Sequence, residues 1–255
     1  MQPNIMINPV MIMFVLGVSG SPTKNANTDK LVKAILDATG MDTEFVKLSD
    51  VNIGPCRACM GCVYTNECVV NDDFRWIAPK VMKADALVVG SPTFFGLPSA
   101  FTKAFMERLY ALRHVNMLTK GKIGAAVAVG CAAEKDVETW LGNILGFSKF
   151  DVAGTMSAKG TPCCSVCGPG ETCAYAAWNA YSPEVSGRDY GVREAYKGYL
   201  EILPDNVPYV KGSARILRKY RNVEDEPGIM DRARSLGEAI VVKLEERARR
   251  DRSVS

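Results

Sequence analysis

The sequence has one histidine and no long apolar segment, and each shortage argues against a class of protein. His114 lies beside Arg113 at the end of a predicted helix, which suits a capping or surface side chain, so a histidine-dependent hydrolase is not expected. The apolar run at residues 11–16 follows no basic segment and precedes no small-residue cleavage site. We interpret this run as a buried first strand and not as a signal peptide or a membrane span.

An excess of charge of one sign is also missing. The 31 lysine and arginine residues nearly balance the 28 aspartate and glutamate residues, which leaves a net charge of +3 without long blocks of like charge. This distribution argues against nucleic acid and membrane surfaces as partners. Neither a G-x-G-x-x-G fingerprint nor a G-x-x-x-x-G-K-[ST] loop occurs, and the chain has no internal repeat.

Cysteine, in contrast, is abundant, with nine residues in 255. A chain of this length with 47% hydrophobic residues can bury its own core and does not need disulfide staples. In the absence of an export signal we expect a cytoplasmic protein. Clustered cysteines in that compartment more often bind metal than form disulfides.

Short apolar segments alternate with longer helical segments over most of the chain. We expect strands near residues 12–18, 43–48, 86–90, 123–129 and 152–156, and helices near residues 28–39, 73–83, 100–112 and 137–145. This alternation predicts an α/β fold, a doubly wound sheet of five parallel strands with Cys-rich loop insertions. Ligands of such sheets bind beyond the carboxyl ends of the strands.

The same pattern divides the chain into three parts. Residues 1–156 form the α/β core and include a cysteine-containing loop at 51–72. Residues 157–226 are rich in Gly, Pro, Tyr and Cys and follow neither the helical nor the strand period, so we expect an elaboration that folds around a site or an interface. Residues 227–255 have one apolar face and predict a C-terminal helix that completes the core.

The first strand runs into the loop GVSGSPTKNANT, residues 17–28. Its small residues let the backbone approach a ligand, while hydroxyls, amides and a helix N-terminus supply donors for a phosphate. This composition predicts a phosphate held by side-chain hydroxyls, as in a mononucleotide. The alternative is a loop in which Asn27 or Thr28 only caps the helix. The candidate phosphate-binding residues are Ser19, Ser21, Thr23, Asn27 and Thr28.

Two further loops follow the third and fourth strands. The third strand leads into GSPTFFGLPSA, where an aromatic pair between Pro and Gly offers a flat wall to a ring system; the alternative is aromatic packing under a turn. The fourth strand ends at Gly130 and Cys131, and Cys131 could contact that ring, bind metal or fill space. The candidate residues of both loops are Pro92, Thr93, Phe94, Phe95, Gly96, Gly130 and Cys131.

A compact C-x2-C-x2-C-x5-C run follows the second strand and consists of Cys56, Cys59, Cys62 and Cys68. Four thiolates within thirteen residues can enclose one cubane, so the run predicts a [4Fe–4S] cluster. Zinc more typically binds two separated C-x2-C pairs, and zinc or disulfides are the alternatives. The position after a strand places the loop at the same rim of the sheet as the other loops.

A second cysteine group lies in the string PCCSVCGPGETC, where Pro and Gly would hold a loop open. Adjacent cysteines do not easily ligate one cluster together. A second cluster, a zinc site and redox-active or unpaired thiols therefore remain as alternatives. The residues concerned are Cys163, Cys164, Cys167 and Cys173.

The strings GSPTKNANT and SPTFFG resemble the FMN-binding loops of NADPH-dependent FMN reductases and iron–sulfur flavoproteins, which have a flavodoxin-like fold. The first cysteine run resembles the defining motif of the iron–sulfur flavoproteins. The resemblance implies that the first loop binds the FMN phosphate and the second the isoalloxazine ring. Four departures are visible: Thr23 replaces an arginine for which Lys24 could substitute, Phe94 or Phe95 replaces a tyrosine, and Glu107 replaces an aspartate. The fourth is Cys131, which stands where relatives commonly have a Gly-rich run.

The resemblance also implies a function. It predicts an FMN-dependent oxidoreductase in which electrons pass from a ferredoxin or similar carrier to a [4Fe–4S] cluster, to FMN and to a small-molecule acceptor. Relatives assemble as dimers or tetramers, which implies a homodimer or homotetramer. The alternatives are an NAD(P)H-dependent FMN or quinone reductase with structural zinc, and a non-catalytic redox sensor or carrier.

Overall fold

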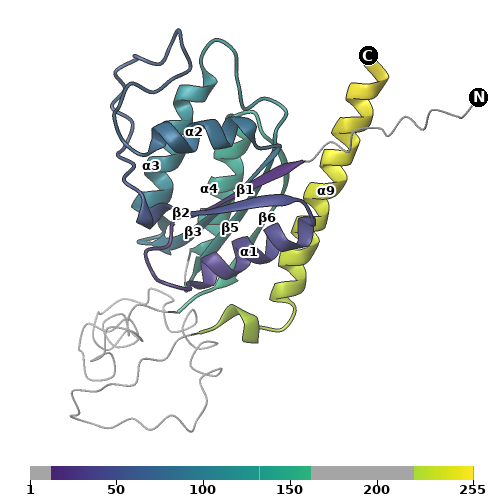
Figure 1. Ribbon diagram of the computed structural model, residues 1–255. Coiled ribbons are helices and arrows are strands. Elements are labelled where there is room, and N and C mark those ends of the chain that lie inside the picture. The colour runs from purple at the N-terminus through teal and green to yellow at the C-terminus, as the bar shows by residue number, and fades with distance from the viewer. Residues whose placement is uncertain (1–12, 132, 162–220, 255) are drawn as a thin grey trace, which may run out of the picture.

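The computed structural model describes residues 13–131, 133–161 and 221–254 (Figure 1). Its central sheet has the parallel strand order β2-β1-β3-β5-β6, and a two-residue strand, β4, pairs with the end of β3 in the antiparallel sense. This order is that of flavodoxin-like folds, which confirms the predicted fold class. The strands are β1 (Phe14–Ser19), β2 (Asp42–Lys47), β3 (Ala86–Phe94), β4 (Leu97–Pro98), β5 (Ile123–Gly130) and β6 (Asp151–Lys159).

Helices cover both faces of the sheet (Figure 1). One face packs against α1 (Asn27–Thr39) and α9 (Ile229–Val254), and the other against α2 (Phe74–Lys83), α3 (Ala100–Arg108) and α4 (Glu134–Phe147). Short 3-10 helices are η1 (Leu48–Asp50), η2 (Leu109–Arg113) and η3 (Val223–Asp225). No helix in the described ranges has the length and apolar content to cross a bilayer.

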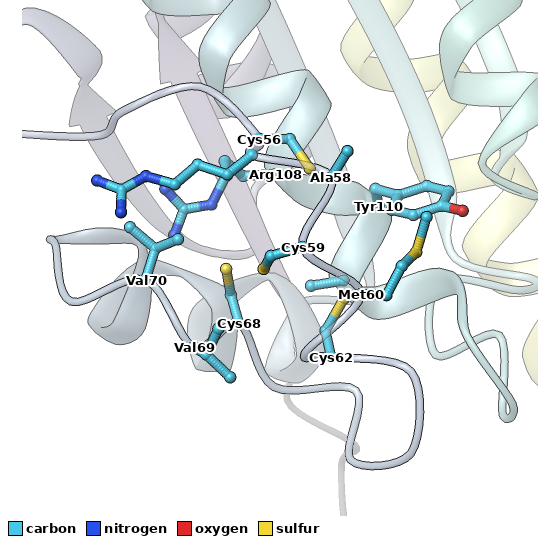
Figure 2. Close-up of a pocket in the computed structure, with 12 residues that line it drawn as sticks. Cys56, Ala58, Cys59, Met60, Cys62, Cys68, Val69, Val70, Arg108 and Tyr110 are labelled. Carbon is cyan, nitrogen blue, oxygen red and sulfur yellow. The ribbon is translucent and has the colours of Figure 1, made fainter.

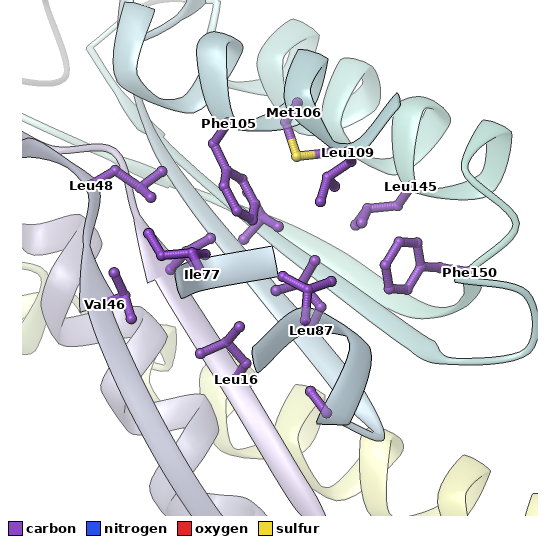
Figure 3. Close-up of a cluster of buried hydrophobic side chains, with 14 of the residues drawn as sticks. Leu16, Val46, Leu48, Ile77, Leu87, Phe105, Met106, Leu109, Leu145 and Phe150 are labelled. Carbon is purple, nitrogen blue, oxygen red and sulfur yellow. The ribbon is translucent and has the colours of Figure 1, made fainter. Parts of the chain in front are cut away.

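Strand alternation sorts the buried apolar side chains into two cores. Leu16 and Leu87 face α2, α3 and α4, whereas their neighbours Val15 and Val88 face α1 and α9. Figure 3 shows the first core, in which helix side chains such as Phe105 gather over the sheet. Two packed layers make the sheet a rigid frame for the loops at the carboxyl ends of its strands.

The third strand is longer than predicted. Thr93 pairs with Pro98 and Phe94 with Leu97, so β3 continues past Gly90 as one arm of a hairpin. Phe95 and Gly96 form the turn with φ of 52° and 77°. Positive φ at both central residues is the conformation that joins two strands through a two-residue turn.

The boundaries of the last strand and the last helix also differ from the predicted ones. β6 continues beyond the expected end at Met156 to Lys159. The C-terminal helix begins at Ile229 and not at Pro227, because Gly228 has a φ of 75° and cannot belong to an α-helix. The second cysteine group, at Cys163, Cys164, Cys167 and Cys173, lies outside the described residues.

Candidate functional site

The loop after β1 leads to a helix N-terminus without a side-chain cap. Ala26 is the N-cap residue of α1 and carries no acceptor for the N–H groups of the first turn. Residues 22–25 are exposed, whereas Ser21 and Thr28 are buried. Neither Asn27 nor Thr28 caps the helix, so that alternative is wrong. Free backbone donors at the start of a helix suit a phosphate.

Two of the predicted phosphate residues contact other parts of the chain. The Ser19 hydroxyl donates a hydrogen bond of 2.6 Å to Asp29 Oδ1. Asn27 Nδ2 donates to the Arg221 carbonyl at 2.7 Å, and Asn27 Oδ1 accepts from Val223 N at 3.2 Å. Ser19 therefore orients Asp29, and Asn27 fastens the loop to the segment that precedes α9.

Lys47, which sequence reasoning missed, places a positive charge at this loop. Its Nζ donates to Asp29 Oδ2 at 2.5 Å and to the Thr23 carbonyl at 2.7 Å. The Lys47 side chain is 13% exposed, whereas Lys24, the substitute suggested by the sequence, is exposed. Ser19 and Lys47 pair as the last residues of neighbouring parallel strands, so the predicted strand ends could have indicated this cation.

The loop after β1 and the β3–β4 hairpin meet at Ser99. The Ser99 hydroxyl donates to the Gly20 carbonyl at 2.7 Å and accepts from Thr102 N at 3.2 Å as the N-cap of α3. Ser99 N donates to Ser91 Oγ at 3.0 Å. A Cβ at position 20 would lie 1.9 Å from Thr102 Oγ1, so only glycine fits there. These contacts hold the two loops in a fixed relation.

The hairpin presents its aromatic side chains to solvent. Phe94 is 47% exposed and Phe95 fully exposed, which rules out the alternative that they pack under a turn. Pro92 and Thr93, near the base of the hairpin, and Gly96 in its turn are half-buried. Exposed aromatic faces of this kind are suited to contact with a flat ring system.

The loop after β5 borders the hairpin. A Cβ on Gly96 would lie 3.8 Å from Ala133 Cβ, which places the start of α4 against the turn. Gly130 is buried and its carbonyl accepts from Gly160 N at 2.8 Å, while Cys131 is half-buried. The three predicted loops therefore gather at the carboxyl ends of β1, β3 and β5.

All four cysteines of the first run line one pocket (Figure 2). Ala58 and Met60 have φ of 51° and 57°, and these left-handed residues turn the chain on either side of Cys59. Burial raises the pKa of the Cys62 thiol above its usual value; a backbone hydrogen bond opposes this rise, and the charges of the other three cysteines add to it. The sequence thus identified a set of residues that the fold brings together.

The spacing of the thiols bears on what the pocket can hold. Within the part of the chain that the structure describes, no three His, Cys, Asp or Glu side chains are grouped closely enough for a single metal ion. Four thiolates around one zinc would stand about 3.8 Å apart, given a Zn–S bond of about 2.3 Å. A cubane places iron and sulfide between its thiolates, so its ligands surround a larger group. Four thiols within thirteen residues that line one pocket are the donor set that such a cluster requires.

A buried ion pair closes the cysteine loop at its base. Arg108 is 1% exposed and contacts Asp72 through Nη1–Oδ2 at 2.5 Å and Nη2–Oδ1 at 2.9 Å. Gly54 joins both residues: its carbonyl accepts from Arg108 at 3.0 Å and its N–H donates to Asp72 at 3.0 Å. Residues 54 and 72, on either side of the cysteines, are therefore held together.

The cysteines lie beside the last turn of α3. Cys56 N donates to Glu107 Oε2 at 3.2 Å, and Arg108, Tyr110 and Ala111 line the pocket with the thiols. The loop starts at the carboxyl end of β2, but the cysteine pocket lies toward the other end of α3 from Ser99. The expectation that the loop shares one rim with the flavin loops therefore holds only for its beginning.

Comparison with known proteins agrees with this arrangement. Residues 13–150 match the family model described as NADPH-dependent FMN reductase. An iron–sulfur flavoprotein of Methanocaldococcus jannaschii is 38% identical over 138 residues, which cover 53% of this chain and 71% of that protein. The chain belongs to the iron–sulfur flavoproteins of the FMN reductase family. It is therefore an FMN-dependent oxidoreductase with a redox role.

Another relative and two solved structures are consistent with this family and fold. An iron–sulfur flavoprotein of Methanosarcina thermophila is 37% identical over 121 residues, 46% of this chain and 63% of that protein. A flavone reductase structure aligns over 91% of this chain and 63% of its own with a TM-score of 0.51 and 15% identity. RosB with bound 8-demethyl-8-formylriboflavin-5′-phosphate aligns over 81% of this chain and 95% of its own with a TM-score of 0.50 and 14% identity. These two structures show the flavodoxin-like fold.

Proposed function

We propose that this flavoprotein carries electrons between a [4Fe–4S] cluster held by its first cysteine run and an FMN held by its three loops. A ferredoxin or similar carrier is the proposed donor and a small molecule the acceptor. The observation that supports this most is the shared pocket of the four cysteines in a chain whose other loops match an FMN reductase. When bound, the cluster exchanges single electrons and the flavin exchanges one or two.

The proposed ligands of the cluster are Cys56, Cys59, Cys62 and Cys68. The chain would keep them in place through the Arg108–Asp72 clamp at the base of their loop and through the hydrogen bond from Cys56 N to Glu107. A preformed loop spares the entropy of ordering it when the cluster assembles. Because the thiols must lose protons to ligate iron, assembly releases protons.

The proposed FMN site uses the first-turn amides of α1 together with Ser21, Thr23 and Thr28 for the phosphate. Ser19 and Asn27 would act through Asp29 and the segment before α9, to which they are bonded. The ring would lie against the hairpin and the loop after β5. The proposed ring-binding residues are Pro92, Thr93, Phe94, Phe95, Gly96, Gly130 and Cys131.

Helix α3 connects the two sites. Its N-cap Ser99 touches the phosphate loop, and its last residues, Glu107 and Arg108, hold the cysteine loop. The helix has nine residues and is about 13 Å long, and both sites contact it.

We further propose that the protein is cytoplasmic, that it forms a homodimer or homotetramer, and that residues 157–226 are an elaboration that shapes the acceptor pocket.

The deciding experiment is the anaerobic measurement of iron, sulfide, zinc and FMN per chain. About four irons with matching sulfide and one FMN are expected, and about eight irons would add a second cluster at Cys163, Cys164, Cys167 and Cys173. Cys62→Ser is expected to lose iron and sulfide while Cys131→Ser keeps both. Zinc without sulfide would contradict the proposal and favour a reductase with structural zinc.

A further inference from the structure

We propose that Arg108 sets the redox potential of the cluster, because its buried positive charge forms one wall of the cysteine pocket and stabilises the reduced form. The inference rests on the proposed function and adds a positioning residue that acts on the cluster by charge. Arg108 lines the pocket together with all four cysteines (Figure 2), whereas Asp72 is not among the residues that line it.

Arg108 is 1% exposed and is the largest fully buried side chain among the residues that the structure describes. A guanidinium removed from water requires compensation, which Asp72 and the Gly54 carbonyl provide for the two terminal nitrogens. The ring of Phe74 lies 4.8 Å from the guanidinium carbon. Solvent therefore screens this charge far less than it screens a charge on the surface.

The clamp does not use every donor of the Arg108 side chain. Arg108 Nε is buried and has no hydrogen-bond partner in the described part of the protein. A clamp needs only the two terminal nitrogens, so the clamp leaves Nε unexplained. Arg108 and Cys68 line the same pocket.

The sign of the expected shift in potential follows from charge. Reduction adds one electron to the cluster, taken from an external one-electron donor, and neither forms nor breaks a bond in the chain. The group is already anionic through its four thiolate ligands, so a nearby positive charge favours the added electron, and a nearby negative charge opposes it. Hydrogen bonds and charge around the ligating sulfurs are established determinants of cluster potential.

A purely structural clamp predicts something different. If the ion pair only holds residues 54 and 72 together, loss of either partner opens the same loop and changes the cluster in the same way. If the charge matters, the two substitutions move the potential in opposite directions. The pair Arg108→Met and Asp72→Asn therefore separates the two roles.

The experiment is a potentiometric titration of the holoprotein with dithionite as reductant, followed by the electron paramagnetic resonance signal of the reduced cluster. Arg108→Met is expected to shift the reduction equilibrium about tenfold toward the oxidised form, about 59 mV lower for one electron. Asp72→Asn is expected to shift it the other way. Lys80→Met, which removes a half-exposed cation paired with Glu44, is the control and should leave the potential unchanged.

Each outcome decides the inference. Equal shifts of the same sign in Arg108→Met and Asp72→Asn, or no shift in either, overturn it. If Arg108→Met holds no iron, the variants Arg108→Lys and Asp72→Asn decide. The potential of Asp72→Asn must then lie above that of the wild type. The potential of Arg108→Lys, which keeps the positive charge, must lie closer to the wild-type value than that of Asp72→Asn does. A wild-type protein without iron and sulfide would instead refute the proposed function itself.

Discussion

The hydroxyl of Ser99 donates a 2.7 Å hydrogen bond to the carbonyl of Gly20, although the two residues lie 79 positions apart in the chain. Ser99 is the N-cap residue of α3, and Gly20 lies in the loop that precedes α1. The contact therefore fixes the phosphate loop against the hairpin that presents the aromatic wall. FMN contacts both loops at once in the proposed site, so this contact between Ser99 and Gly20, here called the joint, should control FMN affinity.

Gly20→Ala tests the joint. The added Cβ would lie 1.9 Å from Thr102 Oγ1 and 2.7 Å from Ser99 Oγ, so the loops must move apart. Overpacking of this kind costs about 1–3 kcal/mol of folding free energy. We expect at least a tenfold loss of FMN affinity, measured by quenching of FMN fluorescence, together with a lower thermal midpoint.

The control for this substitution is Gly146→Ala. Gly146 lies in α4 with no atom within 4 Å of the added Cβ, so alanine should leave FMN affinity unchanged and stabilise the helix by up to about 1 kcal/mol. Removing the obstructing hydroxyl in Gly20→Ala/Thr102→Ala should restore part of the affinity. Full FMN binding by the single Gly20→Ala variant would show that the joint does not matter.

A second prediction distinguishes two lysines near the phosphate. Lys47→Met should weaken FMN binding about tenfold, because it leaves the buried Asp29 carboxylate without its ion pair beside the proposed phosphate site. Lys24→Met removes an equal charge from an exposed side chain and should have a smaller effect. Titration of both apoproteins with FMN at low salt measures the difference. A larger loss in Lys24→Met would favour the residue that the sequence suggested.

The Arg108–Asp72 pair also predicts a pH dependence of stability. Burial opposes ionisation of Asp72, but hydrogen bonds from Arg108 and from backbone amides prevail and hold its pKa below the ordinary 3.8. A folded-state pKa below the unfolded value adds stability above the unfolded pKa, and this stability is lost as pH falls through the folded value. The clamp should therefore stabilise the apoprotein at neutral pH and weaken below about pH 4.

Asp72→Asn should accordingly lower the free energy of unfolding by about 3 kcal/mol at pH 7, because it leaves a buried guanidinium unpaired. The loss should shrink in strongly acidic solution, where the wild-type carboxyl is protonated too. Asp231→Asn is the matched control, since its ion pair with Arg234 is exposed and worth well under 1 kcal/mol. Urea unfolding of the apoproteins across pH checks both, and a pH-independent loss in Asp72→Asn would contradict the assigned cause.

The sheet could be predicted from the sequence because each strand is indicated by residues that are neighbours in the chain. Alternating apolar residues mark each strand, and the cysteine run is continuous, so its four members were expected together and the fold confirms that they share a pocket. The hairpin was missed because its turn consists of Phe95 and Gly96, and a positive φ at phenylalanine is uncommon enough to carry no sequence signal.

The electrostatic partners were missed for a different reason. Lys47 and Asp29 are 18 positions apart, and Arg108 and Asp72 are 36 apart. Each pair depends on how strands and helices stack, and single charged residues are common in any chain. Only the fold shows which charges are buried, and burial is what makes these pairs matter.

A final prediction concerns Asn66, which anchors the part of the loop between Cys62 and Cys68. It is buried with a φ of 57°, and its Nδ2 donates to the carbonyls of Ala111 and His114 at 3.1 and 2.5 Å. Asn66→Ala should cost about 2–4 kcal/mol, because two carbonyls lose their donor and alanine is strained at positive φ.

The consequence for the metal site is kinetic. When residues 62–68 are no longer fastened to η2, iron should pass to an external chelator at least several-fold faster than from the wild type. Asn66→Gly keeps the backbone conformation but loses the amide, so its rate should lie between the two. Asn143→Ala, an exposed position in α4, should leave the rate unchanged. Iron release at the wild-type rate from Asn66→Ala would show that the cluster, once assembled, holds the loop without this anchor.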